Sequence, residues 1–220
     1  MRRLAIIGAS GHGKVVADAA ERAGWDAITF FDDGIAAGTP VGSRTVEGTT
    51  ADLIARGREF TGVVVAVGVN AVRLAVQARL VSARLPIATI VHPAAIVSAS
   101  ASIGAGSVVF AGAVVNAEAR LGAACIVNTA ASVDHECRLA DGVHVCPGAH
   151  LGGDVEVGEG TQIGIGAVVR QCVRIGAGVT VGAGAAVVGD VADGLTVVGV
   201  PARPRGAKAG APDRAPRGVD

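Results

Sequence analysis

The stretch from Ala101 to Ala140 reads ASIGAGSVVFAGAVVNAEARLGAACIVNTAASVDHECRLA and decides the fold, because its apolar pattern repeats every six residues. Valine, isoleucine or leucine occupies every sixth position from Val97 to Val187 without a slip in register. The residue two places earlier is mostly small or β-branched, as at Ala113 and Cys125. Residues two apart on a strand lie on one face. Each hexapeptide therefore predicts a short strand with one small and one aliphatic side chain turned inward.

The position after each aliphatic residue predicts a turn. Glycine, asparagine and aspartate are frequent there, as at Gly104, Asn116 and Asp134, and these residue types tolerate a left-handed backbone. Stacked units of this period form a hexapeptide β-helix, in which the inward residues build continuous ladders. No insertion interrupts the register, so we expect no long loop to project from the solenoid.

The composition of the 220-residue chain limits both its core and its partners. Half of the residues are hydrophobic but only 2% are aromatic, so aliphatic side chains must fill the core. The formal net charge of zero offers no basic excess to bind nucleic acid. The first apolar run is too short for a signal peptide, and no run approaches the roughly 18 residues of a membrane span. We expect a cytoplasmic protein without nucleic-acid or membrane partners.

The four cysteines predict neither disulfides nor a metal site. Cys125 and Cys137 fall in the small inward slot of the repeat and are expected to fill the core. Cys146 and Cys172 are isolated, and the spacings match no zinc pattern. A reducing compartment also argues against disulfide pairing.

The residues before the repeat alternate between strand and helix patterns. Residues 3–25 predict a strand, a glycine-rich turn and a helix, and residues 26–33 predict a second strand. A helix capped by Thr49 or Thr50, a strand over 60–70, a helix over 70–85 and a short strand over 86–93 follow. This order predicts a small Rossmann-like domain over residues 1–92, a β-helix over 93–204 and a flexible tail over 205–220. The fold class is thus α/β followed by all-β.

The turn GASGHG at residues 8–13 is the first candidate site. It opens a helix, and the free backbone N–H groups of a helix N-terminus bind phosphate. Asp32 and Asp33, at the end of the second strand, are placed to hold a ribose or a base. The alternative is a tight strand–helix turn without a ligand, in which His12 only packs.

Five segments together carry a resemblance to a known family. They are GASGHGKV (8–15), FFDD (30–33), AVGVN (66–70), DHEC (134–137) and VVGVPAR (197–203). Over about residues 3–204 the chain resembles the nucleotide-sugar acyltransferases of the PglD, PerB and NeuD type. The resemblance implies a left-handed parallel β-helix of roughly five coils. It also implies a homotrimer with active sites between neighbouring prisms, acetyl-CoA as co-substrate along the solenoid, and a nucleotide-linked sugar on the N-terminal domain.

The resemblance also implies roles for individual residues. His135 corresponds to the general base, Glu136 to the carboxylate beside it, and His144 to a second histidine near the thioester. The implied nucleotide-sugar site comprises Gly8, Ser10, Gly11, His12, Gly13, Asp32, Asp33, Gly68, Asn70 and Arg73. The implied coenzyme A site comprises His144, Gly152, Gly153, Ile165, Gly166, Pro201 and Arg203, and no metal is implied.

Acetyl transfer to an amine needs a base, a polarised carbonyl and proximity. A histidine suits the base because its pKa lies near neutrality, and a carboxylate on its other ring nitrogen fixes the tautomer. Adjacent residues on an extended chain point apart, so contact between His135 and Glu136 depends on the turn. The alternatives are a plain surface histidine at 135 and a backbone-turn role for Asp134. His144 and His150 share an outward repeat position, where His144 is as well placed to face a trimer partner as a ligand.

The resemblance implies an acetyl-CoA-dependent N-acetyltransferase that acts on a UDP- or GDP-linked 4-amino-4,6-dideoxy sugar, and we expect direct transfer with His135 as the base. Two alternatives stay open: a sugar O-acetyltransferase of the NeuD type, and a non-catalytic nucleotide-sugar-binding protein. An NAD-dependent oxidoreductase is disfavoured because the rest of the chain is solenoid with no second catalytic domain.

Overall fold

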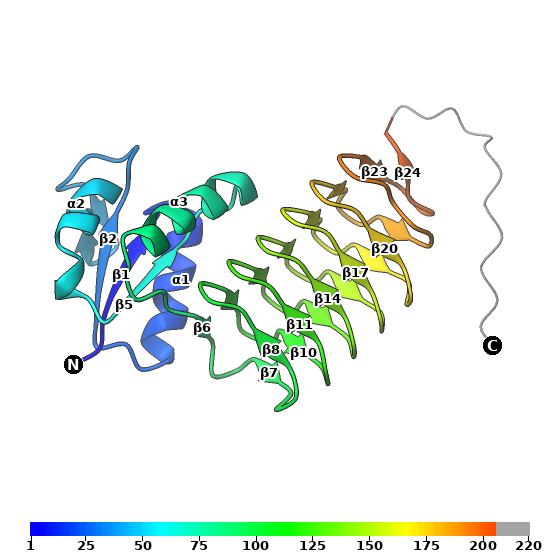
Figure 1. The fold of residues 1–220 in the computed structure, drawn as a ribbon, viewed down its shortest axis with the longest axis horizontal. Coiled ribbons are helices and arrows are strands. Elements are labelled where there is room, and N and C mark those ends of the chain that lie inside the picture. The colour runs from blue at the N-terminus through cyan, green and yellow to red at the C-terminus, as the bar shows by residue number, and fades with distance from the viewer. Residues whose placement is uncertain (206–220) are drawn as a thin grey trace.

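The computed structural model describes residues 1–205 and places an α/β domain at one end of a long solenoid (Figure 1). The predicted tail, from residue 206 on, lies outside the described residues. In the α/β domain, β1 (Arg3–Ile7) is flanked in parallel by β2 (Ala27–Phe31) and β5 (Gly62–Val65). The other elements are α1 (Gly11–Arg22), β3 (Pro40–Val41), β4 (Arg44–Thr45), α2 (Thr50–Ala55), a 3-10 turn (Gly57–Glu59) and α3 (Asn70–Ser82).

The α/β sheet is buried on both faces, as its apolar strands predict. Leu4 and Ile6 of β1 belong to one core together with α1, whereas Ala5 and Ile7 belong to a second core with Leu80 of α3. Helix α2 begins with a capping box between Thr49 and Asp52, which confirms one of the two predicted caps.

Three parallel sheets form the sides of the solenoid, and we name them by their surroundings. The domain face, whose first coils meet the α/β domain, consists of β6 (Ile90–Val91), β9 (Val108–Val109), β12 (Ile126–Val127), β15 (His144–Val145), β18 (Gln162–Ile163), β21 (Thr180–Val181), β23 (Thr196–Val198) and the antiparallel β24 (Arg203–Pro204). The apolar face consists of β7 (Ile96–Val97), β10 (Val114–Val115), β13 (Ser132–Val133), β16 (His150–Leu151), β19 (Val168–Val169) and β22 (Ala186–Val187). The charged face consists of β8 (Ser102–Ile103), β11 (Arg120–Leu121), β14 (Arg138–Leu139), β17 (Glu156–Val157) and β20 (Arg174–Ile175).

The hexapeptide register is confirmed. Val115 pairs with Val133, and Val133 pairs with Leu151, so three hexapeptides complete one coil. The chain runs from the apolar face to the charged face, then to the domain face, and a short corner joins each face to the next. Cys125 and Cys137 are fully buried in the solenoid core, as predicted. The solenoid has about six coils rather than five, because β6 and β23 extend it beyond the strict repeat.

The predicted position of the left-handed turn is wrong. Positive φ angles fall on the third residue after the aliphatic position, as at Glu118 and Ala124, and not on the first. Glycine at the first position has another cause, which is the close approach of neighbouring coils. A Cβ on Gly104 would strike the backbone of Gly122 one coil further on. A side chain there would force the coils apart.

The strand predicted over 86–93 leads into the solenoid as expected, and it adds no strand to the α/β sheet. In β6, Ile90 pairs with Val108 of β9, while Ile87 forms only an isolated bridge with Val63. The two parts share a core, since Ile90, Val108 and Phe110 pack with residues of β1 and α1. The predicted helix over 70–85 also ends earlier, at Ser82. The α/β domain therefore covers the first coils of the domain face.

Candidate active site

The GASGHG turn joins β1 to α1 and leaves the start of the helix open. Gly8 has a φ of +107°, and a Cβ on Gly13 would strike the carbonyl of Gly8, so both positions require glycine. Ser10 is the N-cap residue, but its side chain makes no capping hydrogen bond, and no acidic residue lies in the first turn. Backbone N–H groups at such a helix start are available to an anion. Gly11 is exposed at this opening and has free space around it.

The two predicted aspartates hold neighbouring loops. Asp32 accepts hydrogen bonds from the backbone N–H groups of Ala9 at 2.8 Å, Gly34 at 2.8 Å and Ile35 at 3.0 Å. Asp33 accepts from the backbone and the hydroxyl of Thr50, at 2.7 and 2.9 Å. Asp32 therefore fixes the GASGHG turn, while Asp33 fixes the start of α2.

The predicted residues of the loop after β5 divide into an exposed part and a buried part. Gly68 is exposed beside the candidate site. Asn70 and Arg73 are buried in the joint between α3 and the solenoid. Arg73 is only 1% exposed, and its guanidinium already donates to Ala124, Val67, Gly68, Gly142 and Asn70. This placement leaves Arg73 no free donor for a substrate.

Two histidines from different parts of the chain meet at the joint. His12 of α1 and His144 of β15 have ring centroids 6.5 Å apart, and Phe110 packs edge-on against His12 at 5.7 Å. Burial and the nearby charge of Arg73 lower the pKa of His12 to about 4. Burial, Arg73 and His12 lower the pKa of His144 to about 3. Both imidazoles are therefore neutral near pH 7.

The neutral form of His144 has one defined tautomer. The Asn128 side-chain oxygen accepts from the Thr129 N–H at 2.9 Å, so the Asn128 amide group faces Nε2 of His144 at 3.1 Å. Nε2 is then the acceptor, and the proton resides on Nδ1. Within residues 1–205, this Nδ1 and Nε2 of His12 are buried without a hydrogen-bond partner. Buried polar atoms of this kind are open positions to which a ligand or a water can bind.

His135 lies on the corner between the apolar and the charged face. Asp134 holds it by accepting from the His135 N–H at 2.8 Å and from the Asn116 amide at 2.8 Å. Glu136 is left-handed, with a φ of +60°, and this turn brings its Oε2 to 3.0 Å from Nδ1 of His135. The contact between adjacent side chains thus depends on one backbone angle. With Nδ1–H donating to the carboxylate, Nε2 of the exposed ring is free to accept a proton.

The predicted coenzyme A residues lie on two different corners, at the end of the solenoid and, for His144, on the domain face. Gly152 and Gly153 share the corner of His135, and the His135 ring lies where a Cβ of Gly153 would stand. Ile165, 61% exposed, and Gly166 lie on the corner between the domain and the apolar face. Pro201 and Arg203 follow β23 at the end of the solenoid. No single surface of one chain holds all of these residues.

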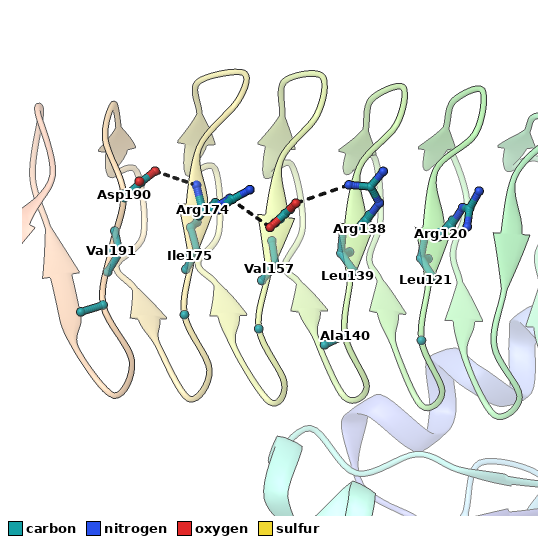
Figure 2. Close-up of a pocket in the computed structure, with 15 residues that line it drawn as sticks. Arg120, Leu121, Arg138, Leu139, Ala140, Val157, Arg174, Ile175, Asp190 and Val191 are labelled. Carbon is teal, nitrogen blue, oxygen red and sulfur yellow. Dashed lines mark hydrogen bonds and ion pairs between the residues drawn. The ribbon is translucent and has the colours of Figure 1, made fainter. Parts of the chain in front are cut away.

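A trough of about 970 Å³ runs along the charged face. Figure 2 shows Arg120, Arg138 and Arg174 in one row, with Arg138 and Arg174 paired to Glu156 at 3.3 and 3.1 Å. None of the predicted site residues lines this trough. We place the candidate site at the histidines rather than here, because both carboxylates of the trough are already engaged: Glu156 pairs with two arginines, and Asp190 accepts from the backbone N–H of Arg174.

The sequence did not single out Asn128 and Phe110, which contact the two neutral histidines. A signal was present for both. Asn128 lies two residues after Ile126, which occupies the position of His144 one coil earlier. Phe110 is one of only four phenylalanines in the chain and falls in the solenoid repeat.

Within residues 1–205, no helix is long and apolar enough to span a membrane.

Comparison with known proteins agrees with this geometry. A family model described as the PglD N-terminal domain matches residues 3–80, and one described as bacterial transferase hexapeptide (six repeats) matches residues 154–189. No match was found among curated proteins.

Solved structures resemble almost the whole chain. The acetyltransferase domain of PglB from Neisseria gonorrhoeae FA1090 is 46% identical, with a TM-score of 0.88, over 93% of this chain and 100% of its own. It is also known in complex with acetyl coenzyme A. PerB from Caulobacter crescentus, solved with CoA and GDP-perosamine, is 36% identical with a TM-score of 0.88, over 94% and 98%. WeeI from Acinetobacter baumannii AYE is 27% identical with a TM-score of 0.86, over 93% and 100%. The chain therefore belongs to the PglD/PerB family of left-handed β-helix acetyltransferases.

Proposed function

We propose that this enzyme transfers the acetyl group of acetyl-CoA to the amine of a UDP- or GDP-linked 4-amino-4,6-dideoxy sugar. The observation that carries the proposal is the hydrogen bond between His135 and Glu136, because it leaves Nε2 of an exposed imidazole free as a base. PerB, whose structure contains GDP-perosamine, and the PglB domain, whose structure contains acetyl coenzyme A, support the two substrates.

His135 moves one proton in the reaction. The amine nitrogen attacks the thioester carbonyl carbon, and the bond between that carbon and sulfur breaks. Nε2 of His135 takes the proton that the amine loses and returns it to the departing sulfur. The products are an acetamido sugar nucleotide and free coenzyme A. Glu136 stabilises the imidazolium between the two transfers, as in a catalytic triad.

The neutral pair of His12 and His144 is suited to bind polar groups of the substrates at the joint between the α/β domain and the solenoid. Nδ1–H of His144 is a buried donor with no hydrogen-bond partner in the described part of the chain, so it can donate to an oxygen of the thioester or the sugar. Nε2 of His12 is the second open position. The start of α1 lies beside it and supplies backbone N–H groups for the diphosphate.

A homotrimer would bring these separated parts together. The corner of His135 lies opposite the domain face, which carries His144, so one prism cannot unite them. The apolar face lies between the corner of His135 and the corner of Ile165. If three apolar faces surround a common axis, the His135 corner of one copy meets the Ile165 corner of the next. The outward side chains of this face support such contact, since Ile96 and Val168 are exposed by 67% and 45%.

Mass spectrometry tests the proposal directly. The full chain is incubated with acetyl-CoA and UDP- or GDP-linked 4-amino sugars, with the corresponding hydroxy sugars as controls. One added acetyl group on an amino sugar only is the expected result, and it also identifies the nucleotide. Acetylation of hydroxy sugars alone would establish O-transfer instead. If acetyl-CoA stays intact with every acceptor and the protein does not bind acetyl-CoA, the proposed acetyltransferase activity is excluded.

A matched pair of variants tests the role of the carboxylate. Glu136→Gln should lower kcat, whereas Glu118→Gln should leave it unchanged. Glu118 occupies the same corner one coil earlier and is also left-handed, with a φ of 61°, but Ala117 replaces the histidine beside it. An equal fall of kcat in both variants would show that Glu136 affects the rate only by shaping the backbone turn and not through its hydrogen bond to His135.

A further inference from the structure

Helix α3 lies along the corner between the charged and the domain face and contacts four successive coils. Gln77 donates to the carbonyl of Ala105 at 2.9 Å, and Asn70 donates to the carbonyl of Gly160 at 2.8 Å. Between them, Arg73 donates to the carbonyls of Ala124 and Gly142, both at 2.8 Å. Side chains three and four residues apart on a helix share one face, and here that face matches the stacking of the coils.

Arg73 connects the two halves of the candidate site. Its Nη1 donates to the carbonyl of Val67 at 2.9 Å, in the loop of the nucleotide-sugar half. Its Nη2 donates at 2.8 Å to Gly142, two residues before His144 in the half that receives the acetyl donor. Nη2 also donates to Oδ1 of Asn70 at 2.9 Å, which fixes the first residue of α3. The planar guanidinium reaches all of these acceptors at once, which an ammonium group cannot do.

The guanidinium remains charged although it is buried. Burial lowers the pKa of Arg73 to about 10, so it stays protonated at neutral pH. No ion pair joins Arg73 to a carboxylate within residues 1–205. Four backbone carbonyls and the side-chain oxygen of Asn70 compensate this buried cation. Removing the acceptors of such a buried charge is strongly destabilising, so the guanidinium ties these acceptors to one arrangement.

We propose that Arg73 is a positioning residue for acetyl transfer, which holds the nucleotide-sugar half and the acetyl-donor half of the site in one fixed arrangement. This role rests on the proposed function. Arg73 touches neither substrate, because all of its donors are engaged by the protein. It acts through Val67 on one side and through the strand of His144 on the other.

The charge of Arg73 has a second effect, on the protonation of the histidine pair. The guanidinium faces His12 from α1 and His144 from β15 and disfavours a positive charge on both, in addition to their burial. Within residues 1–205, His12 also lowers the pKa of His144. The thiol of Cys125 faces the guanidinium, and Asp141 faces that thiol. Burial and the charge of Arg73 both favour neutral imidazoles. His144 therefore remains a one-proton donor at its open nitrogen.

Two substitutions separate placement from charge. Arg73→Met removes the hydrogen-bond donors and the positive charge. Arg73→Lys keeps the charge but loses the planar guanidinium with its five donors. Arg58→Met, an exposed arginine of the α/β domain, is the matched control. Each full-length variant is measured by acetyl-transfer kinetics and by NMR titration of the histidine side chains in the absence of substrates.

We expect kcat to fall at least about tenfold in both Arg73 variants, since misplaced reacting groups lose rate steeply. The pKa values of His12 and His144 should rise in Arg73→Met and stay low in Arg73→Lys. Wild-type kinetics in Arg73→Lys would overturn the proposal. If Arg73→Met does not fold, the kinetics of Arg73→Lys alone test the positioning role. Unchanged histidine titrations in a folded Arg73→Met would overturn the charge effect. If the wild type transfers no acetyl group, the proposed function fails, while the titration still tests the effect of Arg73.

Discussion

Gly153→Ala is the sharpest test of the His135 base, because it alters no polar group. The added Cβ would stand at Cε1 and Nε2 of the His135 ring, well inside van der Waals contact. The ring must then retreat on the order of 1 Å, and a displacement of that size lowers an enzymatic rate about 100-fold. Gly153 has no positive φ, and the His135 ring is exposed, so the ring moves without strain in the fold. We therefore expect the unfolding free energy to change by less than about 0.5 kcal/mol.

Initial rates at varied acetyl-CoA, with thermal unfolding of the same samples, measure both quantities. Gly189→Ala is the control, since a Cβ there meets nothing within 4 Å and its φ is ordinary. A fall in kcat at unchanged stability is expected for Gly153→Ala only. A kcat within twofold of wild type would refute the reasoning. A rise in KM for acetyl-CoA with unchanged kcat would refute it as well, because Gly153 would then act on the coenzyme rather than on the ring.

Three further predictions concern the fold. Leu151→Ala, which opens a cavity in the solenoid core, should lower the unfolding free energy by about 2–5 kcal/mol in urea denaturation; a loss below about 1 kcal/mol would contradict a packed interior. Cys172→Gly should raise stability by about 0.5 kcal/mol, because Cys172 is exposed with a φ of 59° and glycine adopts that angle without strain; lower stability in calorimetry would argue against it. The folded-state pKa values of His12 and His144, about 4 and about 3, lie below the ordinary histidine pKa of 6.5, so the unfolded chain binds more protons between these values. The contribution of these two histidines to stability should be constant above pH 6.5 and fall as the pH drops toward 4, and His144→Gln should flatten this slope in denaturation at several pH values.

The solenoid could be predicted from the sequence because its signal is strictly local. Each coil repeats the inward pair of side chains, so the register of Val115, Val133 and Leu151 follows from counting. The left-handed positions could not be assigned in the same way. Glycine serves both at left-handed corners and where coils approach closely, as at Gly104, and the residue type alone does not separate these uses.

The candidate site was less accessible to sequence reasoning, because its contacts are long-range. The pair of His135 and Glu136 was visible as a dipeptide, but their contact depends on the φ of Glu136. The meeting of His12 with His144 depends on how two domains dock. Arg73 follows the loop that resembles the nucleotide-sugar site, so the sequence predicts a substrate contact, whereas docking turns its side chain toward the solenoid.

The fit of α3 against four coils limits how such a chain can change its length. The helix advances about 1.5 Å per residue, and neighbouring strands lie about 4.8 Å apart, so Gln77, Arg73 and Asn70 reach their carbonyls only in the present order of coils. A hexapeptide triplet inserted between Ala105 and Gly160 would put the backbone of the new coil beside the helix and move the coil of Gly160 beyond the reach of Asn70. A triplet added after Gly160 would leave these contacts unchanged. Evolution can therefore lengthen this prism at its far end, while the coils beside the helix keep a fixed number.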